Sequence, residues 1–131
     1  MVAGIGCRSG VTAEQVEAAL TAALQQNALH GHSLTFIATA AAKSSEPALV
    51  AVARARGIPL TSISQAELEA ASPRTLTHSE YSMAAMHVPS VAEAAALASC
   101  GSRSQLLGPR IIVGPVTCAL AVSLSKRTDA P

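Results

Sequence analysis

Short apolar runs alternate along this chain with segments whose apolar side chains recur at helical spacing. The apolar runs predict three buried strands, at residues 2–5, 34–38 and 60–63. Val16 and Leu20 belong to the clearest helical period, which predicts a helix from about Ala13 to Ala28. Strands that alternate with helices in this way indicate βαβ units.

Capping signals show where further helices begin. Three pairs have the form of a capping box, in which a hydroxyl and a later Glu or Gln bond to each other's backbone N–H groups: Thr12 with Gln15, Ser64 with Glu67, and Ser90 with Glu93. The second box predicts a short helix that Pro73 closes, and the third predicts an alanine-rich helix that ends at Cys100–Gly101. A serine cap with Pro47 in the first turn predicts another helix, which stops at Gly57.

The last third of the chain is less regular. Residues 73–89 show no clean period and are expected to be loop with one helical turn. Residues 110–113 and 116–122 flank a Gly114–Pro115 turn and predict a terminal β-hairpin. We therefore expect one α/β domain over residues 1–124, with a mostly parallel sheet, helices on both faces and a C-terminal β-hairpin, followed by a polar tail at 125–131.

Composition narrows the class of protein. Half of the 131 residues are hydrophobic, 13% are charged and the formal net charge is +1, which is typical of a compact domain. Phe36 and Tyr81 are the aromatic residues, and basic and acidic residues nearly balance, so we expect no nucleic-acid partner. Asp129 is the single aspartate and lies in the tail, so the body of the domain cannot supply a Ser-His-Asp triad.

The cysteines and the N-terminus indicate a compartment. Cys7, Cys100 and Cys118 are odd in number and form no C-x-x-C pair, which favours reduced thiols over a disulfide framework or a metal site. The first residues lack the basic and apolar regions of a secretory signal. The apolar stretch at 111–124 is too short and too broken to span a bilayer. We expect a cytoplasmic protein with no membrane association and no metal.

A glycine-bearing turn follows the first predicted strand. Gly4, Gly6 and Gly10 do not form a dinucleotide fingerprint, because Ser9 stands where the third glycine is needed. The turn either serves close packing or binds an anion through backbone N–H groups and Arg8. Cys7 precedes a helix and adjoins Arg8, where a thiol pKa falls, but a small packed cysteine is the commoner outcome.

Charged residues stand at two more helix starts. Lys43 and Ser45 follow the second predicted strand, where an ammonium could clamp a carboxylate or phosphate or could be a surface charge. Glu46 could favour the helix N-terminus through the dipole. Ser90 and Glu93 are explained by their capping box, yet they would converge on the same sheet edge as Arg8 and Lys43.

Several of these residues fall into ordered motifs. They are Gly4-Ile5-Gly6-Cys7-Arg8, Lys43-x-x-Glu46-Pro47, Pro89-Ser90-Val91-Ala92-Glu93-Ala94-Ala95-Ala96-Leu97, and the closing Leu107-x-Pro109-Arg110 with Val116-Thr117-x-Ala119. From Val2 to about Val122 the chain resembles the CobE/CbiG C-terminal domain family of cobalamin biosynthesis. The family pattern shares these positions, except that lysine usually stands where this chain has Arg110.

The resemblance implies a protein of the corrin pathway with an α/β domain. Two-domain CbiG proteins open the lactone ring of a cobalt-precorrin and release a two-carbon fragment as acetaldehyde. This chain has no room for the other domain and looks like the stand-alone CobE form. Its shared positions include Gly6, Cys7, Lys43, Ser90 and Thr117.

Three functions remain open at this point. The leading hypothesis is an accessory protein that needs no cofactor and binds a corrinoid or precorrin at the carboxyl-end edge of the sheet, with another pathway enzyme as a possible partner. Arg8, Lys43 and Arg110 would bind the carboxylates of such a macrocycle, with Ser45 among the ligand contacts. The alternative is a precorrin lactone hydrolase that uses Glu46 or Glu93 as general base. A third hypothesis is a generic small-anion-binding α/β domain.

Overall fold

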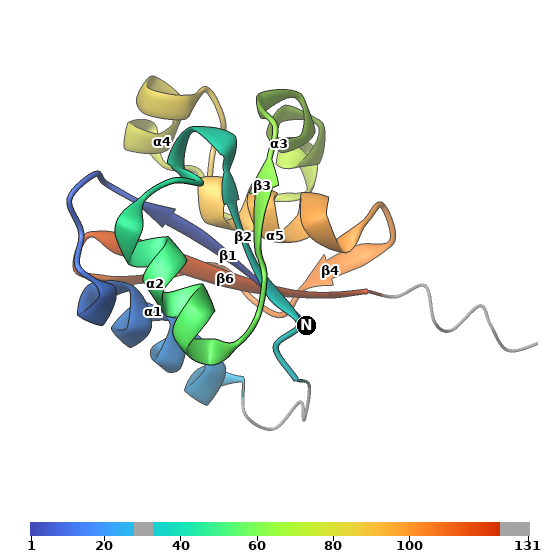
Figure 1. Cartoon of the computed structure of the whole chain (residues 1–131). Coiled ribbons are helices and arrows are strands. Elements are labelled where there is room, and N and C mark those ends of the chain that lie inside the picture. The colour runs from blue at the N-terminus through green and yellow to red at the C-terminus, as the bar shows by residue number, and fades with distance from the viewer. Residues whose placement is uncertain (28–32, 124–131) are drawn as a thin grey trace, which may run out of the picture.

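The described residues of the chain fold into a six-stranded sheet flanked by five α-helices (Figure 1). The structure, a computed structural model, describes residues 1–27 and 33–123. The strands are β1 (Val2–Cys7), β2 (Phe36–Ala40), β3 (Leu60–Ile63), β4 (Ser104–Leu106), β5 (Ile111–Val113) and β6 (Val116–Ser123). The helices are α1 (Ala13–Gln26), α2 (Pro47–Arg56), α3 (Gln65–Ala71), α4 (Glu80–Met86) and α5 (Val91–Cys100).

The sheet is mixed, so the expectation of a mostly parallel sheet is wrong. The strand order is β3-β2-β1-β6-β4, and β5 pairs with β6 as well. β1 with β2 and β2 with β3 are parallel, whereas β6 runs antiparallel to β1, β4 and β5. The predicted hairpin explains the difference, because its second arm does not end the sheet at an edge but inserts beside β1.

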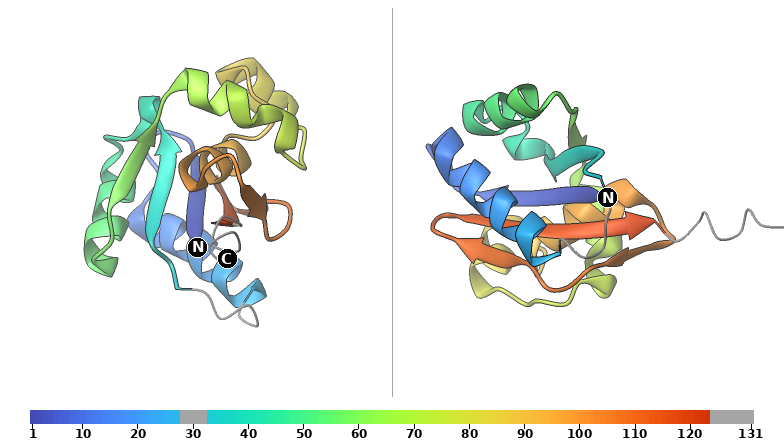
Figure 2. Two further views of the ribbon diagram at one scale, coloured as in Figure 1. Left: turned by 90° about the vertical axis from the view of Figure 1, so that its right-hand side faces the viewer. Right: turned by 90° about the horizontal axis from the view of Figure 1, so that it is seen from below.

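Helices cover both faces of the sheet, as expected (Figure 2). Side chains alternate between the faces along each strand. Ala3 and Ile5 of β1 pack with α1 and α2, whereas Val2 packs with α3 and α5. Both layers are rich in alanine, which allows the helices to lie close to the strands.

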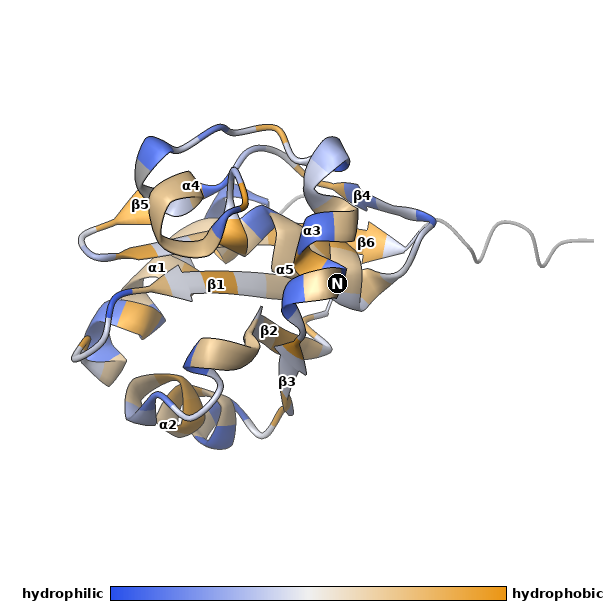
Figure 3. Ribbon diagram, turned by 90° about the horizontal axis from the view of Figure 1, so that it is seen from above, coloured by the Kyte–Doolittle hydropathy of each residue, from blue (hydrophilic) through white to orange (hydrophobic). Residues whose placement is uncertain are grey.

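α5 approaches β1 very closely at Gly4. A Cβ atom added to Gly4 would lie 2.0 Å from the carbonyl oxygen of Ala92 and 2.6 Å from the backbone nitrogen of Ala96. Only glycine allows the helix backbone to come this near the strand. In Figure 3 the apolar ribbon of α5 accordingly lies directly beside β1.

Most of the helix starts and stops predicted from capping residues are confirmed. The capping boxes of Thr12 with Gln15 and of Ser64 with Glu67 are both present. Gly57 ends α2 with a φ of 70°. Glu46, not a serine, occupies the N-cap position of α2, and the Ser44 hydroxyl donates to the carbonyl of Ala41 instead.

Elsewhere the observed elements differ from the predicted ones in extent. Residues 73–89 contain the seven-residue helix α4 rather than a single turn. α1 is described to Gln26 with Asn27 as its cap, and the predicted end at Ala28 lies outside the described residues. The polar tail at 125–131 also lies outside them, so the domain boundary at 124 stays a prediction. Among the described residues, no helix is long and apolar enough to cross a membrane.

Candidate functional site

A cleft of about 380 Å³ opens where β1 ends. Five parts of the chain meet there: the end of β1, the segment after β2, the helix α4, the start of α5 and the β5–β6 hairpin. Figure 3 shows α4 and the tip of the hairpin beside the carboxyl end of β1. The cleft therefore lies at the predicted sheet edge, where the parallel strands β1 and β2 both end.

Three cationic side chains from three separate loops line this cleft. They are Arg8 after β1, Lys43 after β2 and Arg110 before β5. Among the described residues that line it there is no aspartate or glutamate. We call this the cationic cleft. A site with this charge and both guanidinium and ammonium donors is suited to carboxylates or phosphates.

Apolar and hydroxyl groups complete the walls. Met86 of α4, Val91 of α5 and Ile112 of the hairpin contribute apolar surface, and Ile112 is 62% exposed. Ser79, Ser82 and Thr117 contribute hydroxyl groups. The Ser82 residue is 7% exposed, and its Oγ has no hydrogen-bond partner in the described structure.

Two contacts join the loop after β1 to the segment between β2 and α2. Lys43 Nζ donates a hydrogen bond to Ser9 Oγ at 2.8 Å. Glu46 Oε2 accepts one from the backbone N–H of Gly10 at 3.1 Å. Glu46 thus accepts a hydrogen bond from the loop and is not among the residues that line the cationic cleft.

Cys7 is a half-buried thiol whose environment opposes ionisation. Burial raises its pKa above the ordinary value, the nearby Glu46 carboxylate raises it further, and the Lys43 ammonium acts in the opposite direction. The position of Cys7 before a helix suggested a lowered pKa, and that suggestion is therefore wrong. The structure favours the other interpretation, a small packed cysteine in the wall of the cleft.

Gly6 and Thr117 are cross-strand neighbours on β1 and β6. A Cβ atom at Gly6 would lie 2.8 Å from Thr117 Oγ1, so the glycine makes room for the threonine side chain. The Thr117 hydroxyl donates to the Gly6 carbonyl at 3.3 Å. Both residues line the cationic cleft.

Glu93 is fully buried and does not line the cleft. Its Oε1 accepts hydrogen bonds from the backbone N–H groups of Leu76 at 2.7 Å and Thr77 at 2.9 Å. Its Oε2 accepts from the Thr77 hydroxyl at 2.6 Å and from the backbone N–H of Arg110 at 2.8 Å. Ser90, also fully buried, caps α5 by accepting from the Glu93 N–H at 3.4 Å.

Six of the ten residues that the sequence put forward line the cationic cleft: Gly6, Cys7, Arg8, Lys43, Arg110 and Thr117. The other four, Ser45, Glu46, Ser90 and Glu93, do not. Ser45 is exposed at the start of α2.

Sequence reasoning missed the contribution of α4 and of Ile112. Neither offered a signal, because α4 is short and the hairpin residue looked like one more strand position.

Among the described residues, no group of three His, Cys, Asp or Glu side chains is arranged to hold a metal ion.

Comparison with known proteins identifies the family. The family model described as "Cobalamin synthesis G C-terminus" matches residues 1–121, most of the chain. The chain belongs to this family of cobalamin biosynthesis proteins. The resemblance inferred from the motifs is therefore confirmed.

Individual relatives agree with that assignment. Protein CobE from Sinorhizobium sp is 32% identical over 129 residues, which cover 98% of this chain and 84% of that protein. The crystal structure of CobE, a protein from the cobalamin (vitamin B12) biosynthetic pathway, superposes with a TM-score of 0.83 at 36% identity, over 92% of this chain and 87% of that one. The cobalamin biosynthesis protein chiG from Agrobacterium tumefaciens superposes with a TM-score of 0.73 at 39% identity, over 94% and 98%.

Proposed function

We propose that this CobE-like protein is an accessory protein of cobalamin biosynthesis that binds a polycarboxylate corrin-pathway intermediate in the cationic cleft. The observation that carries the proposal is the convergence of Arg8, Lys43 and Arg110 on one cleft whose described lining residues include no aspartate or glutamate. Charge-assisted hydrogen bonds from guanidinium and ammonium groups are the strong contacts available to carboxylates.

The size of the cleft limits how such a ligand binds. A volume of about 380 Å³ lies near the lower end of the range for sites that enclose drug-sized molecules, about 300–1,000 Å³. A corrin macrocycle with its side chains is larger than those molecules. We therefore propose that the cleft takes one edge of the ring with its carboxylates, while the rest stays outside.

Apolar surface lies next to the cations. Ile112 is a large hydrophobic residue that is 62% exposed, and Met86 and Val91 lie across the same cleft. A planar ring edged with carboxylates has both properties that this wall matches, because its face is apolar and its rim is anionic. An isolated small anion would leave the apolar part of the wall uncovered, which favours the macrocycle over a generic anion.

The geometry supports binding better than lactone hydrolysis. A general base must reach a water beside the substrate. Glu93 is fully buried and accepts four hydrogen bonds, and Glu46 accepts one from Gly10 outside the cleft lining. Neither carboxylate lies where a ligand in the cationic cleft would meet it. Holding an intermediate for another enzyme of the pathway is thus the role that we propose.

A matched pair of ligands tests this function. Dicyanocobyrinic acid carries free carboxylates around a corrin ring, and its fully esterified analogue has the same ring without the charges. Titration followed by absorbance should show binding of the acid and much weaker binding of the ester. Removing two cations in Arg8→Ala/Lys43→Ala should weaken binding of the acid by about 100-fold, at about tenfold for each charge-assisted contact.

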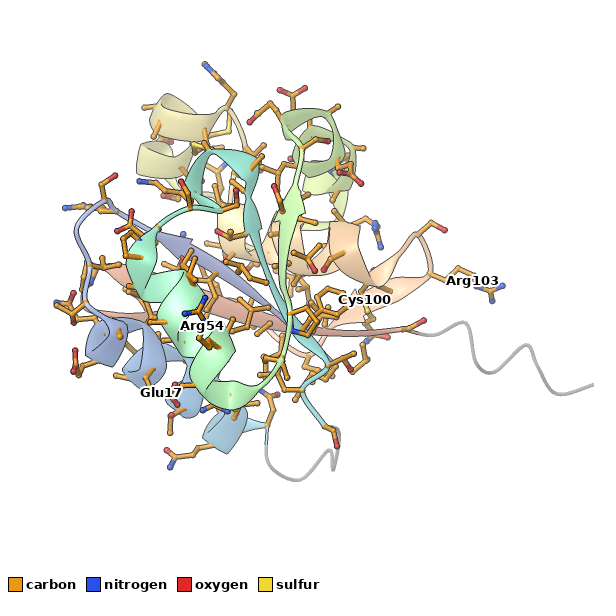
Figure 4. All side chains as sticks on the ribbon, in the orientation of Figure 1. Glu17, Arg54, Cys100 and Arg103 are labelled. Atoms are coloured by element: carbon orange, nitrogen blue, oxygen red, sulfur yellow. The ribbon has the colours of Figure 1, made fainter. Side chains whose placement is uncertain are left out.

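The control is Arg103→Ala. Arg103 is an exposed arginine in the turn between α5 and β4, and its side chain points away from the fold (Figure 4). This variant should bind the acid as the wild type does. Equal affinity for acid and ester, or for wild type and the double variant, would overturn the proposal. Acetaldehyde released from a lactone-bearing precorrin would favour the hydrolase instead.

A further inference from the structure

Glu93 does not play the part that its capping signature suggests. In a capping box, the carboxylate three residues after the N-cap bonds back to the N-cap N–H. Ser90 does accept from the Glu93 N–H, but both carboxylate oxygens of Glu93 bond instead to Leu76, Thr77 and Arg110. The side chain joins the start of α5 to two other segments, residues 76–77 and Arg110.

Both of those segments belong to or adjoin walls of the cationic cleft. Thr77 leads directly into Ser79, the N-cap of α4, and α4 supplies Ser82 and Met86 to the cleft. Arg110 is one of the three cations. Through two hydrogen bonds to Thr77 and one to the backbone of Arg110, Glu93 therefore reaches both the α4 wall and a ligand-binding cation without touching the cleft.

The contacts suit a carboxylate and no other side chain. A buried anion is stable only where hydrogen bonds or opposite charges replace water. Here four donors approach two oxygens at 2.6–2.9 Å, in the first turn of α5, where the helix dipole also favours negative charge. A glutamine would turn its NH₂ group towards at least one backbone N–H, which cannot accept.

We infer that Glu93 is the positioning residue of the cleft: it sets where Arg110 and the α4 wall stand, and so determines affinity for the ligand without contacting it. The inference rests on the proposed function, and it replaces the general-base role that the sequence suggested. It also gives the Glu93 carboxylate a role besides the helix cap, which Ser90 already supplies.

The decisive variant is Glu93→Gln, which keeps the shape of the side chain and disturbs the hydrogen bonds. We expect it to weaken binding of dicyanocobyrinic acid by about tenfold, the scale of one charge-assisted contact. In an Arg110→Ala background it should weaken binding much less, because the cation that Glu93 positions is already absent. Hydrogen exchange should show faster exchange at the amides of Thr77 and Arg110.

A milder pair of variants covers the case in which Glu93→Gln does not fold. Thr77→Val removes one hydroxyl donor to Glu93, and Thr75→Val removes a similar hydroxyl that bonds to the Ser72 carbonyl instead. Thr77→Val should weaken binding and speed exchange at Arg110, and Thr75→Val should do neither.

The outcomes separate the two proposals. Unchanged affinity and unchanged exchange at Arg110 in Glu93→Gln or Thr77→Val, or losses that simply add to that of Arg110→Ala, would overturn the positioning role. Wild-type protein that fails to bind the acid would overturn the proposed function, whereas the exchange measurements would still report whether Glu93 holds Thr77 and Arg110.

Discussion

The Glu46 carboxylate accepts a hydrogen bond from the backbone N–H of Gly10, across the boundary between two βα loops. This contact holds a negative charge near the Cys7 thiol, which the Lys43 ammonium partly offsets. Burial is the main reason that the pKa of Cys7 is raised, and the Glu46 charge comes second. The reactivity of Cys7 therefore reports on both charges.

Alkylation of Cys7 should respond to these charges with opposite signs. Glu46→Gln removes a charge that raises the pKa of Cys7, so more thiolate is present at pH 8 and iodoacetamide should react faster. Lys43→Met removes a charge that lowers the pKa, so the reaction should slow. Mass spectrometry of the labelled peptide measures both rates. A change of the same sign in the two variants would contradict the electrostatic explanation.

Cys118 should resist alkylation until the protein unfolds. It is 1% exposed, and burial raises its pKa to about 12. At pH 8 almost no thiolate forms, and reagent cannot reach the sulfur. In the native protein a thiol reagent should label Cys7 and Cys100, which are only partly buried, and should label Cys118 after denaturant is added. Rapid labelling of Cys118 in the native state would show that β6 opens locally.

Gly4→Ala should be strongly destabilising. The added Cβ would meet the backbone of α5 at 2.0 Å and 2.6 Å, so the helix must move off the sheet. Overpacking of this kind costs about 1–3 kcal/mol and occasionally more, and we expect about 3 kcal/mol in urea unfolding. Gly108→Ala is the control, because an added Cβ there meets nothing within 4 Å. Equal stability of the two variants would contradict the close approach.

The ion pair between Glu17 of α1 and Arg56 of α2 should give a small, pH-dependent stabilisation. A side-chain hydrogen bond from Arg56 lowers the pKa of Glu17 below the ordinary glutamate value. Because that pKa is lowered in the folded state, the stabilisation is complete above the ordinary value and is lost as the pH falls through the lowered one. Both side chains are partly exposed, so we expect about 0.5 kcal/mol.

Arg56→Ala tests the ion pair, and Arg54→Ala is its matched control on the same helix (Figure 4). At pH 7 Arg56→Ala should unfold at a slightly lower urea concentration than the control. The difference should disappear in acid, below the lowered pKa of Glu17. A difference that persists there would indicate a packing effect of the arginine stem.

Local features of this fold could be predicted from the sequence, and the direction of its sheet could not. The box of Thr12 with Gln15 involves neighbouring residues, so its pattern determines its structure. The pairing of Val2 with Ala121 involves opposite ends of the described chain, and no short pattern records it. A hairpin was predictable at Gly114–Pro115, but its insertion beside β1 depends on how the whole sheet packs.

Part of the candidate site could likewise be predicted from the sequence, and part could not. Arg8 and Lys43 could be expected together, because both follow parallel strands that end at one edge. The wall formed by α4 could not, because a seven-residue helix over a cleft has no complete apolar face to produce a period. The capping box predicted for Ser90 and Glu93 is only half formed, for a physical reason. Ser90 accepts from the Glu93 N–H, but the Glu93 carboxylate accepts from groups remote in sequence, such as the Arg110 N–H, instead of from its own helix start.

The place of β6 in the sheet bears on how this protein is made. β6 pairs with β1 on one side and with β4 and β5 on the other, yet it is the last strand of the described chain. During synthesis on the ribosome, the edge of β1 that pairs with β6 stays unpaired until the other described strands have been made, because β6 is the last of them. Contacts so distant in sequence slow folding and leave edges open to wrong pairing. The nascent chain is therefore most prone to wrong strand pairing just before Val116–Ser123 leaves the exit tunnel.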